Sequence, residues 1–289
     1  MRTPTLAGIR LVTLACNVPG PVAVARLHSL GASVVKIEPP AGDHLERAAP
    51  RWYAALCDGC AVQRLNLKEE ADRSKLDAYL QDAHLFVTSS RPSALARLGL
   101  AWDDVHRRHP RLSQIAIVGE TAPHVERSGH DLTYLAKAGL LDPPSMPKTL
   151  LADLAGAERT VSAALEALYR VKLGLEPECT YVGLFDVLET FAMPFEHRLT
   201  APGGSLAGGF AGYGIYRTRD GWIAVAALEP RFIARLQKEL GEKSFDRAAF
   251  QAKFLEKDAC EWEAWGAARD LPIVALKNQD PQTAAPRTA

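Results

Sequence analysis

The sequence predicts an α/β fold, with a Rossmann-like open parallel sheet in a large domain followed by a smaller, truncated α+β domain. Three observations lead to this prediction. Short apolar runs typical of buried strands alternate with helical patterns across residues 1–200. A glycine-rich stretch at 201–214 interrupts this alternation. A shorter set of strand and helix patterns then follows over 215–278.

The first elements form a β-α-β unit. Residues 8–14 are a short apolar run typical of a buried strand, and the turn-prone segment 17–21 ends it. An apolar-periodic helix is predicted over 22–30, and a second strand over 33–38. Because strand, helix and strand follow one another so closely, we expect parallel pairing with a right-handed crossover.

The same alternation continues along the large domain. It predicts a polar helix over 69–81, a strand over 85–88, a helix over 94–108 and a strand over 112–117. The longest helical pattern runs from Asp153 to about residue 170. Open sheets of this kind bind their ligands at the carboxyl ends of their strands, so we look for a site in the loops that follow them.

The glycine-rich stretch at 201–214 contains six glycines in fourteen positions. Such a segment does not hold a stable helix, and we interpret it as a hinge or mobile flap at the domain boundary. Beyond it, the small domain begins with a strand over 222–227 and a helix over 231–240. Residues 279–289 are polar and rich in proline and alanine, which predicts a disordered tail.

Composition narrows the classes of function. The chain has 34 basic and 34 acidic residues, which argues against a nucleic-acid surface or a binder of anionic membranes. No apolar run reaches the length of a membrane span, and the opening residues 1–4 lack a signal-peptide core, so we expect a cytoplasmic protein. Cys57 and Cys60 form a CxxC pair without further ligands at metal spacing, so no metal site is expected.

Two segments carry candidate catalytic residues. The loop after the strand at 112–117 contains His130 and Asp131. His130 is either a general base or a surface or capping residue, since histidine titrates near neutral pH. Asp153 lies among apolar neighbours at the start of the long helix. It is either the N-cap of that helix or a nucleophile or base whose pKa the helix terminus tunes.

Three further observations concern binding. Arg91 precedes a proline after the strand at 85–88. It is either an ordinary surface residue or a residue that binds phosphate. Glu229 also precedes a proline, where an extended backbone and the end of a strand are ordinary. No GxGxxG or P-loop pattern is present, so a nicotinamide cofactor is unsupported.

Several motifs occur in order along the chain and together resemble one known family. They are an opening strand at 6–12, the run 30–40 followed by Gly42-Asp43, Asn66-Leu67-Lys68, Arg91-Pro92 with Arg97-Leu98-Gly99, the run 129–135, Asp153, and the run 214–222. On these motifs the chain resembles the family III CoA-transferases, a superfamily that also contains the alpha-methylacyl-CoA racemases. The resemblance covers roughly residues 6–240.

The resemblance implies an enzyme that uses coenzyme A or an acyl-CoA as substrate, with a carboxylic acid as the second substrate and no tightly bound cofactor. It implies a homodimer of interlocked chains. Asp153 would attack the acyl-CoA carbonyl, pass through an anhydride and carry CoA as an aspartyl thioester, while the stretch at 201–214 shields it from water. Lys36, Arg91 and Tyr134 would bind the CoA.

Two alternatives stay open. In the racemases of the same superfamily, residues matching His130 and Asp153 move a proton across the alpha carbon, and residues matching Asp131 and Glu229 support them. The third reading is a non-catalytic CoA-binding paralogue, because the chain is shorter at its C-terminus than usual members of the family.

Overall fold

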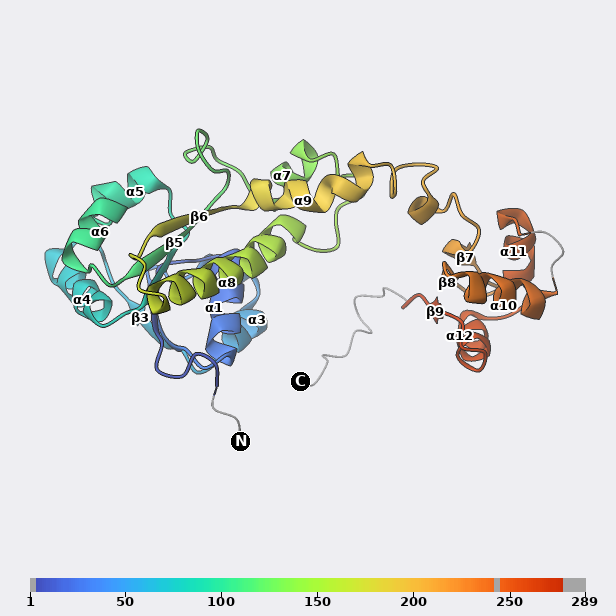
Figure 1. The fold of residues 1–289 in the computed structure, drawn as a ribbon, viewed down its shortest axis with the longest axis horizontal. Helices are drawn as coiled ribbons and strands as arrows, with labels where there is room; N and C mark the ends of the chain where they lie inside the picture. The colour runs from blue at the N-terminus through green and yellow to red at the C-terminus, as the bar shows by residue number, and fades with distance from the viewer. Residues whose placement is uncertain (1–3, 242–244, 278–289) are drawn as a thin grey trace. The chain divides into compact units, whose positions relative to one another are not determined.

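The fold is described from a computed structural model, over residues 4–241 and 245–277. The chain divides into two compact units, Met1–Ala192 and Met193–Ala289, and each is considered by itself (Figure 1). The tail predicted at 279–289 lies outside the described residues.

The first unit is built on a six-stranded sheet in the order β3-β2-β1-β4-β5-β6, with every neighbouring pair parallel. The strands are β1 (Arg10–Thr13), β2 (Ser33–Glu38), β3 (Ala61–Arg64), β4 (Leu85–Thr88), β5 (Ser113–Val118) and β6 (Cys179–Gly183). The chain moves outward from β1 to β3, then returns to the other side of β1 and moves outward again from β4 to β6. The loops after β1 and β4 therefore diverge, which opens a crevice at the carboxyl edge of the sheet.

Helices cover both faces of this sheet. They are α1 (Pro19–Ser29), α2 (His44–Ala48), α3 (Pro50–Leu56), α4 (Glu70–Gln81), α5 (Pro92–Arg97), α6 (Trp102–Arg108), α7 (Asp131–Lys137), α8 (Leu151–Lys172) and α9 (Leu184–Glu196). Alternate strand residues such as Leu11 and Val87 pack with α1 and α8 in one buried cluster. Their neighbours Val12 and Phe86 pack with α4, α5 and α6 in another. The period of two in the strands thus divides the core into two layers.

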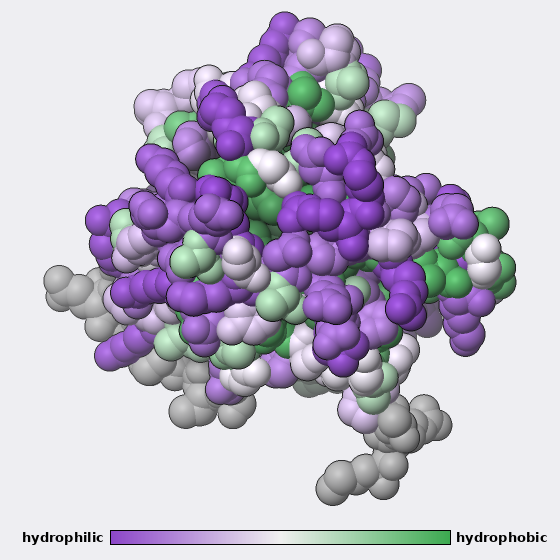
Figure 2. Space-filling model, turned by 90° about the vertical axis from the view of Figure 1, so that its left-hand side faces the viewer, coloured by the Kyte–Doolittle hydropathy of each residue, from purple (hydrophilic) through white to green (hydrophobic). Residues whose placement is uncertain are grey.

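Seen from the side that carries α4 and α6, the surface of this unit is mostly hydrophilic, and apolar residues show in a hollow between polar ridges (Figure 2). Among the helices of the described ranges, none combines the length and apolar composition that a membrane span requires.

The single helix predicted over 94–108 is wrong, because the structure contains two. Gly99 has φ +68°, and the N–H of Leu100 returns to the carbonyl of Leu95 at 2.9 Å. A left-handed glycine with such a backbone bond is the usual end of a helix. Ala101 then starts α6 from an extended conformation.

The second unit contains a three-stranded antiparallel sheet, ordered β7-β8-β9. Its elements are η1 (Ser205–Ala207), β7 (Tyr213–Arg217), β8 (Trp222–Ala226), α10 (Pro230–Leu240), α11 (Arg247–Phe254), α12 (Ala259–Ala267) and β9 (Ile273–Ala275). Aromatic rings fill its core, where Phe254 lies 5.0 Å from Tyr216 and 5.1 Å from Trp262 between ring centroids. A parallel α/β unit followed by a smaller α+β unit confirms the predicted fold class.

The two units separate between Ala192 and Met193, near the end of α9. This boundary precedes the glycine-rich stretch at 201–214, which contains η1 and leads into β7. The hinge or flap role of this stretch stays a prediction.

Candidate active site

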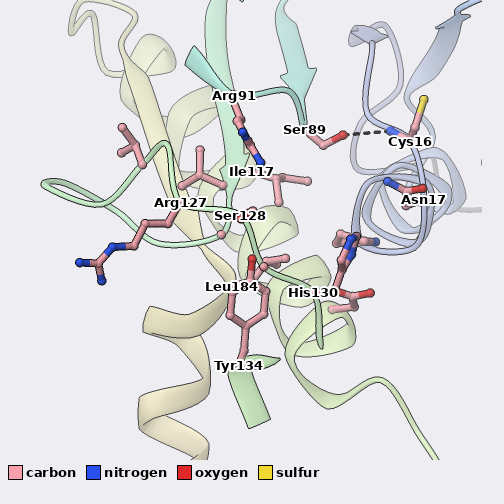
Figure 3. A pocket seen from close by; sticks show the side chains of 16 residues that line it. Cys16, Asn17, Ser89, Arg91, Ile117, Arg127, Ser128, His130, Tyr134 and Leu184 are labelled. Carbon is pink, nitrogen blue, oxygen red and sulfur yellow. Dashed lines mark hydrogen bonds between the residues drawn. The ribbon is translucent and has the colours of Figure 1, made fainter. Parts of the chain in front are cut away.

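A cavity of about 230 Å³ lies at the carboxyl edge of the large sheet, where β1, β4 and β5 end. Every residue that lines it belongs to the first unit. They are Cys16, Asn17, Pro19, Ser89, Arg91, Ile117, Val118, Gly119, Val125, Arg127, Ser128, Gly129, His130, Tyr134, Asp153 and Leu184 (Figure 3). The cavity therefore occupies the crevice that the strand order creates.

Asp153 is the third residue of α8, and the N-cap position belongs to Leu150. The N-cap alternative for Asp153 is therefore wrong. Its side chain is half-buried, and its carboxylate has no hydrogen bond or ion pair with the residues that the structure describes. Burial, reinforced by the negative charge of Asp131 and partly opposed by His130, raises the pKa of Asp153 from 3.8 to about 6. Near neutral pH this carboxyl group can exist in both protonation states.

Asp131 supports this position from the first turn of α7. It is 4% exposed, and its Oδ1 accepts a hydrogen bond from the backbone N–H of Asp153 at 3.1 Å. The first N–H groups of a helix lack partners within the helix, so Asp131 satisfies one of those of α8. Its other oxygen, Oδ2, is buried without a hydrogen-bond partner in the described part of the chain. Asp131 thus fixes the backbone of Asp153 and also repels its charge.

His130 is the N-cap of α7. Its backbone N–H donates to Oγ1 of Thr133 at 3.0 Å, and that hydroxyl donates back to the carbonyl of His130 at 2.8 Å. These two bonds are made by the backbone of His130. Its exposed imidazole lines the cavity beside Asp153. The capping and acid/base alternatives for His130 are therefore compatible.

Tyr134 forms a buried wall of the cavity. A Cβ atom on Gly119 would lie 2.3 Å from its hydroxyl oxygen, and one on Gly129 would lie 2.4 Å from its ring. Both positions need glycine because the tyrosine ring lies against their backbones. Burial, followed by the charges of Asp153 and Glu120, raises the pKa of Tyr134. Its hydroxyl is therefore a neutral hydrogen-bond donor at neutral pH.

Two arginines line the cavity and differ in direction. Arg91 is the N-cap of α5, and its guanidinium points toward Ile117, among the lining residues (Figure 3). Arg127 points away from them in the same view. Of these two arginines, Arg91 is the one whose guanidinium faces the cavity.

Lys36 does not line the cavity. Its ammonium donates to Oε1 of Glu38 at 2.6 Å and to Oδ2 of Asp43 at 2.7 Å, and only 3% of its side chain is exposed. Burial opposes its charge, but the bonds to Asp43 and Glu38 outweigh that effect and raise the pKa of Lys36. Lys36 therefore stays charged inside an ion-pair cluster.

A second cavity, of about 370 Å³, shares Cys16, Asn17 and Ser89 with the first. Apolar side chains from the ends of β1, β2 and β3 and from α5 form most of its other walls, with Lys68 at its edge. The two cavities together follow the carboxyl edge of the sheet from β3 to β5.

No group of three or more metal-ligating side chains occurs in residues 4–241 and 245–277. Cys57 and Cys60 are free thiols.

Comparison with known proteins decides the family. The model of CoA-transferase family III matches residues 6–269. The chain belongs to CoA-transferase family III.

Relatives within family III include both kinds of enzyme. The human alpha-methylacyl-CoA racemase is 28% identical over 288 residues, covering 89% of this chain and 74% of the racemase. The succinyl-CoA–D-citramalate CoA-transferase of Chloroflexus aurantiacus is 23% identical, with 82% of this chain and 65% of that enzyme covered. The mouse succinyl-CoA:glutarate CoA-transferase is 25% identical, with 77% and 56% covered. The chain thus spans less than two thirds of these two transferases.

Solved structures of family III share the fold. The Mycobacterium tuberculosis protein Rv3272 superposes with a TM-score of 0.81 at 23% identity, over 99% of this chain and 86% of that one. A CAIB/BAIF family protein from Brucella suis superposes with a TM-score of 0.79 at 22% identity, over 97% and 87%.

The residues that the family resemblance implied belong to both units. The cavity brings together Asp153, His130, Arg91 and Tyr134, with Asp131 behind Asp153. Glu229 lies in the second unit as the N-cap of α10.

The lining residues that were not predicted as part of the site include Cys16, Asn17 and Ser89. Of these three, the turn-prone segment at 17–21 was a signal for Asn17 alone.

Proposed function

We propose that this chain is a family III CoA-transferase-like enzyme that moves CoA between carboxylic acids through Asp153. One observation carries the proposal: the carboxylate of Asp153 faces a cavity, half-buried, without a partner among the described residues. An unpaired carboxylate is unfavourable in such a place and is typical of a reactive group. A pKa of about 6 leaves it ionised at pH 7 and more basic than an ordinary aspartate, which suits a nucleophile.

The proposed reaction proceeds through two kinds of covalent intermediate. An oxygen of Asp153 attacks the acyl-CoA carbonyl, and the C–S bond breaks to give a mixed anhydride and CoA thiolate. The thiolate then attacks the Asp153 carbonyl and releases the first carboxylate, which leaves an aspartyl-CoA thioester. The second carboxylate attacks the carbonyl of this thioester, the C–S bond breaks to release CoA thiolate, and a new anhydride forms. The thiolate finally attacks the new acyl carbonyl, and Asp153 is regenerated.

The surroundings of Asp153 suggest how the substrate is held. We assign binding of the anionic part of CoA to Arg91, whose guanidinium faces the cavity. We assign to Tyr134 a hydrogen bond that its hydroxyl donates to the substrate. The adjoining cavity of about 370 Å³ is apolar enough to take the less polar parts of the molecule. Asp131 holds the start of α8 so that the carboxylate of Asp153 keeps its direction during the reaction.

A second candidate reaction is racemisation at the alpha carbon of an acyl-CoA. One observation favours it: the exposed imidazole of His130 lines the same cavity as Asp153. His130 is also close enough to affect the pKa of Asp153. A racemase needs two such acid/base groups on opposite sides of one carbon. Glu229 would support them only if the second unit brings it to the site.

The experiment incubates the full chain with succinyl-CoA and a series of free carboxylic acids, and follows new CoA esters by mass spectrometry. A parallel incubation in heavy water contains 2-methylacyl-CoA. Transfer predicts new esters that depend on Asp153, and Asp153→Ala should abolish them while the circular dichroism spectrum is retained. Deuterium at the alpha carbon that depends on both His130 and Asp153, with no new ester, supports the racemase instead. CoA binding without either product supports the non-catalytic paralogue.

The homodimer stays a proposal of the family resemblance. Light scattering of the purified chain tests it, because a monomeric mass would contradict it.

A further inference from the structure

A buried cluster of charges lies beside the proposed active site. Lys36, Glu38 and Asp43 all have side chains that are at most 3% exposed. The ammonium of Lys36 joins the two carboxylates at 2.6 and 2.7 Å. Tyr53 closes the cluster, since its hydroxyl donates to Glu38 at 2.6 Å and its ring lies 4.7 Å from the ammonium. Oε2 of Glu38 has no hydrogen-bond partner in the described part of the chain and lies 3.8 Å from Nε of Arg64.

Asp43 connects this cluster to the loop after β1. Its Oδ1 accepts hydrogen bonds from the backbone N–H groups of Asn17 and Leu45, both at 3.0 Å. Asn17 has φ +68°, a left-handed conformation that asparagine adopts more readily than most other residues. The bond to Asp43 fixes the backbone of Asn17 in this conformation. The preceding residue is fixed as well, since the N–H of Cys16 donates to Oγ of Ser89 at 3.0 Å.

Residues 16 and 17, whose backbone N–H groups make these bonds, lie at the junction of the two cavities. Cys16 and Asn17 line both the cavity that contains Asp153 and the adjoining one. A ligand that extends from one cavity into the other must pass this backbone. A shift of the loop would therefore change the passage without changing Asp153, which is carried by α8.

We propose that Asp43, held by its ion pair with Lys36, is a positioning residue that fixes the backbone of Asn17 and so determines how tightly CoA is bound across the two cavities. The inference rests on the proposed CoA-dependent function. Lys36 then acts on the ligand through Asp43 and not as a phosphate ligand. Its ammonium is enclosed by Glu38, Asp43 and the ring of Tyr53, which leaves it no exposed face toward either cavity.

The principal test is Asp43→Asn, which keeps the shape of the side chain and leaves the neutral pair of Lys36 and Glu38 in place. In the wild type, one carboxylate oxygen of Asp43 accepts from Lys36 and the other accepts from two backbone N–H groups. The asparagine amide has a single acceptor oxygen, so it cannot make both sets of bonds. Calorimetry with CoA should show about tenfold weaker binding, the loss typical of one charge-assisted hydrogen bond. The maximal rate at saturating acyl-CoA should change less than about threefold, because Asp153 is untouched.

A pantetheine thioester, which lacks the nucleotide phosphates, separates positioning from phosphate binding. If Asp43 positions the loop, Asp43→Asn weakens CoA and the thioester by the same factor. A loss confined to CoA would overturn the inference, because it would point to a phosphate contact.

Asp43 is also the N-cap of α2, so a second variant tests whether weaker binding arises only from the loss of this cap. Asp43→Ser retains a good N-cap but is too short to contact Lys36 and Asn17 together. It should bind CoA as weakly as Asp43→Asn. Wild-type affinity in Asp43→Ser would overturn the inference, because it would show that Asp43 acts only as the N-cap of α2.

The matched control is Asp258→Asn in the second unit. Asp258 is also an N-cap aspartate paired with a cation, Arg219, at 2.7 Å. It should leave CoA affinity unchanged. A wild-type chain that does not bind CoA would contradict the proposed function itself, whereas a wild-type chain and an Asp43→Asn variant of equal affinity would contradict only the role of Asp43.

Discussion

Asp153→Asn should stabilise the protein at neutral pH while it removes activity. The pKa of Asp153 is raised from 3.8 to about 6, so the folded chain holds this proton more tightly than the unfolded chain. Stability contributed by the protonated form is present at low pH and is lost as the pH rises from 3.8 through about 6. Above pH 6 the folded protein carries a carboxylate in an unfavourable place, and an amide there removes the penalty.

The magnitude follows from the size of the shift. A change from 3.8 to about 6 corresponds to about 3 kcal/mol between the two protonation states. Asp153 is partly exposed, so solvent screening reduces this to about 1.5 kcal/mol. The amide also loses the favourable interaction of a carboxylate with the first turn of a helix, about 0.5 kcal/mol. The expected net gain is about 1 kcal/mol, or about 2–4 °C in melting temperature for a domain of this size.

Urea denaturation of wild type and Asp153→Asn at pH 8 and pH 4 checks this prediction. The gain should be present at pH 8 and absent at pH 4. The control is Asp103→Asn, an exposed acid in the first turn of α6, which should bring no gain at either pH. A variant less stable than wild type at pH 8, or an equal gain at both pH values, would refute the reasoning about Asp153.

Three further predictions concern the surroundings of Asp153. Arg91→Ala should weaken CoA binding about tenfold, the loss of one charged hydrogen bond, and should reduce its salt dependence. Calorimetry with CoA and dephospho-CoA measures this, and unchanged affinity for both would remove Arg91 from the site. Gly129→Ala should lower stability by about 1–3 kcal/mol in urea denaturation, because the added Cβ would lie 2.4 Å from the ring of Tyr134. Gly221→Ala, whose Cβ would have no neighbour closer than 3.9 Å, is the control, and equal losses in the two variants would contradict the packing argument. His130→Ala should lower alpha-proton exchange about 10²–10⁴-fold if the enzyme is a racemase. In a transferase the rate should fall less, since the bond is made at the carbonyl.

The sequence predicted the central strands because they are buried on both faces and read as apolar runs. β4 and β5 are fully buried along their length, and both were expected within one residue of their bounds. β3 was missed because it is an edge strand with three polar or small residues, Ala61, Gln63 and Arg64, exposed along it. A polar edge strand cannot be distinguished from a loop without knowledge of its neighbour.

The site was predicted where local sequence carries the signal. Asp153 was identified by its apolar neighbours and by the family motif, and the cavity contains it. The role of Lys36 could not be read in the same way. Its partner Asp43 follows a turn at Gly42, which has φ +76°, and only the folded chain brings the two charges within 2.7 Å. Asn17 and Ser89 likewise meet at the cavity because β1 and β4 are neighbours in the sheet.

The central claim, that Asp153 carries CoA during turnover, is tested most directly by trapping the intermediate. The full chain is incubated with an acyl-CoA, quenched, digested and analysed by mass spectrometry, with and without hydroxylamine. Our account predicts CoA linked as a thioester to the peptide that contains Asp153, its conversion to a hydroxamate by hydroxylamine, and neither product in Asp153→Asn. Transfer of CoA that proceeds with no adduct on this peptide, or with the adduct on another residue, would contradict it.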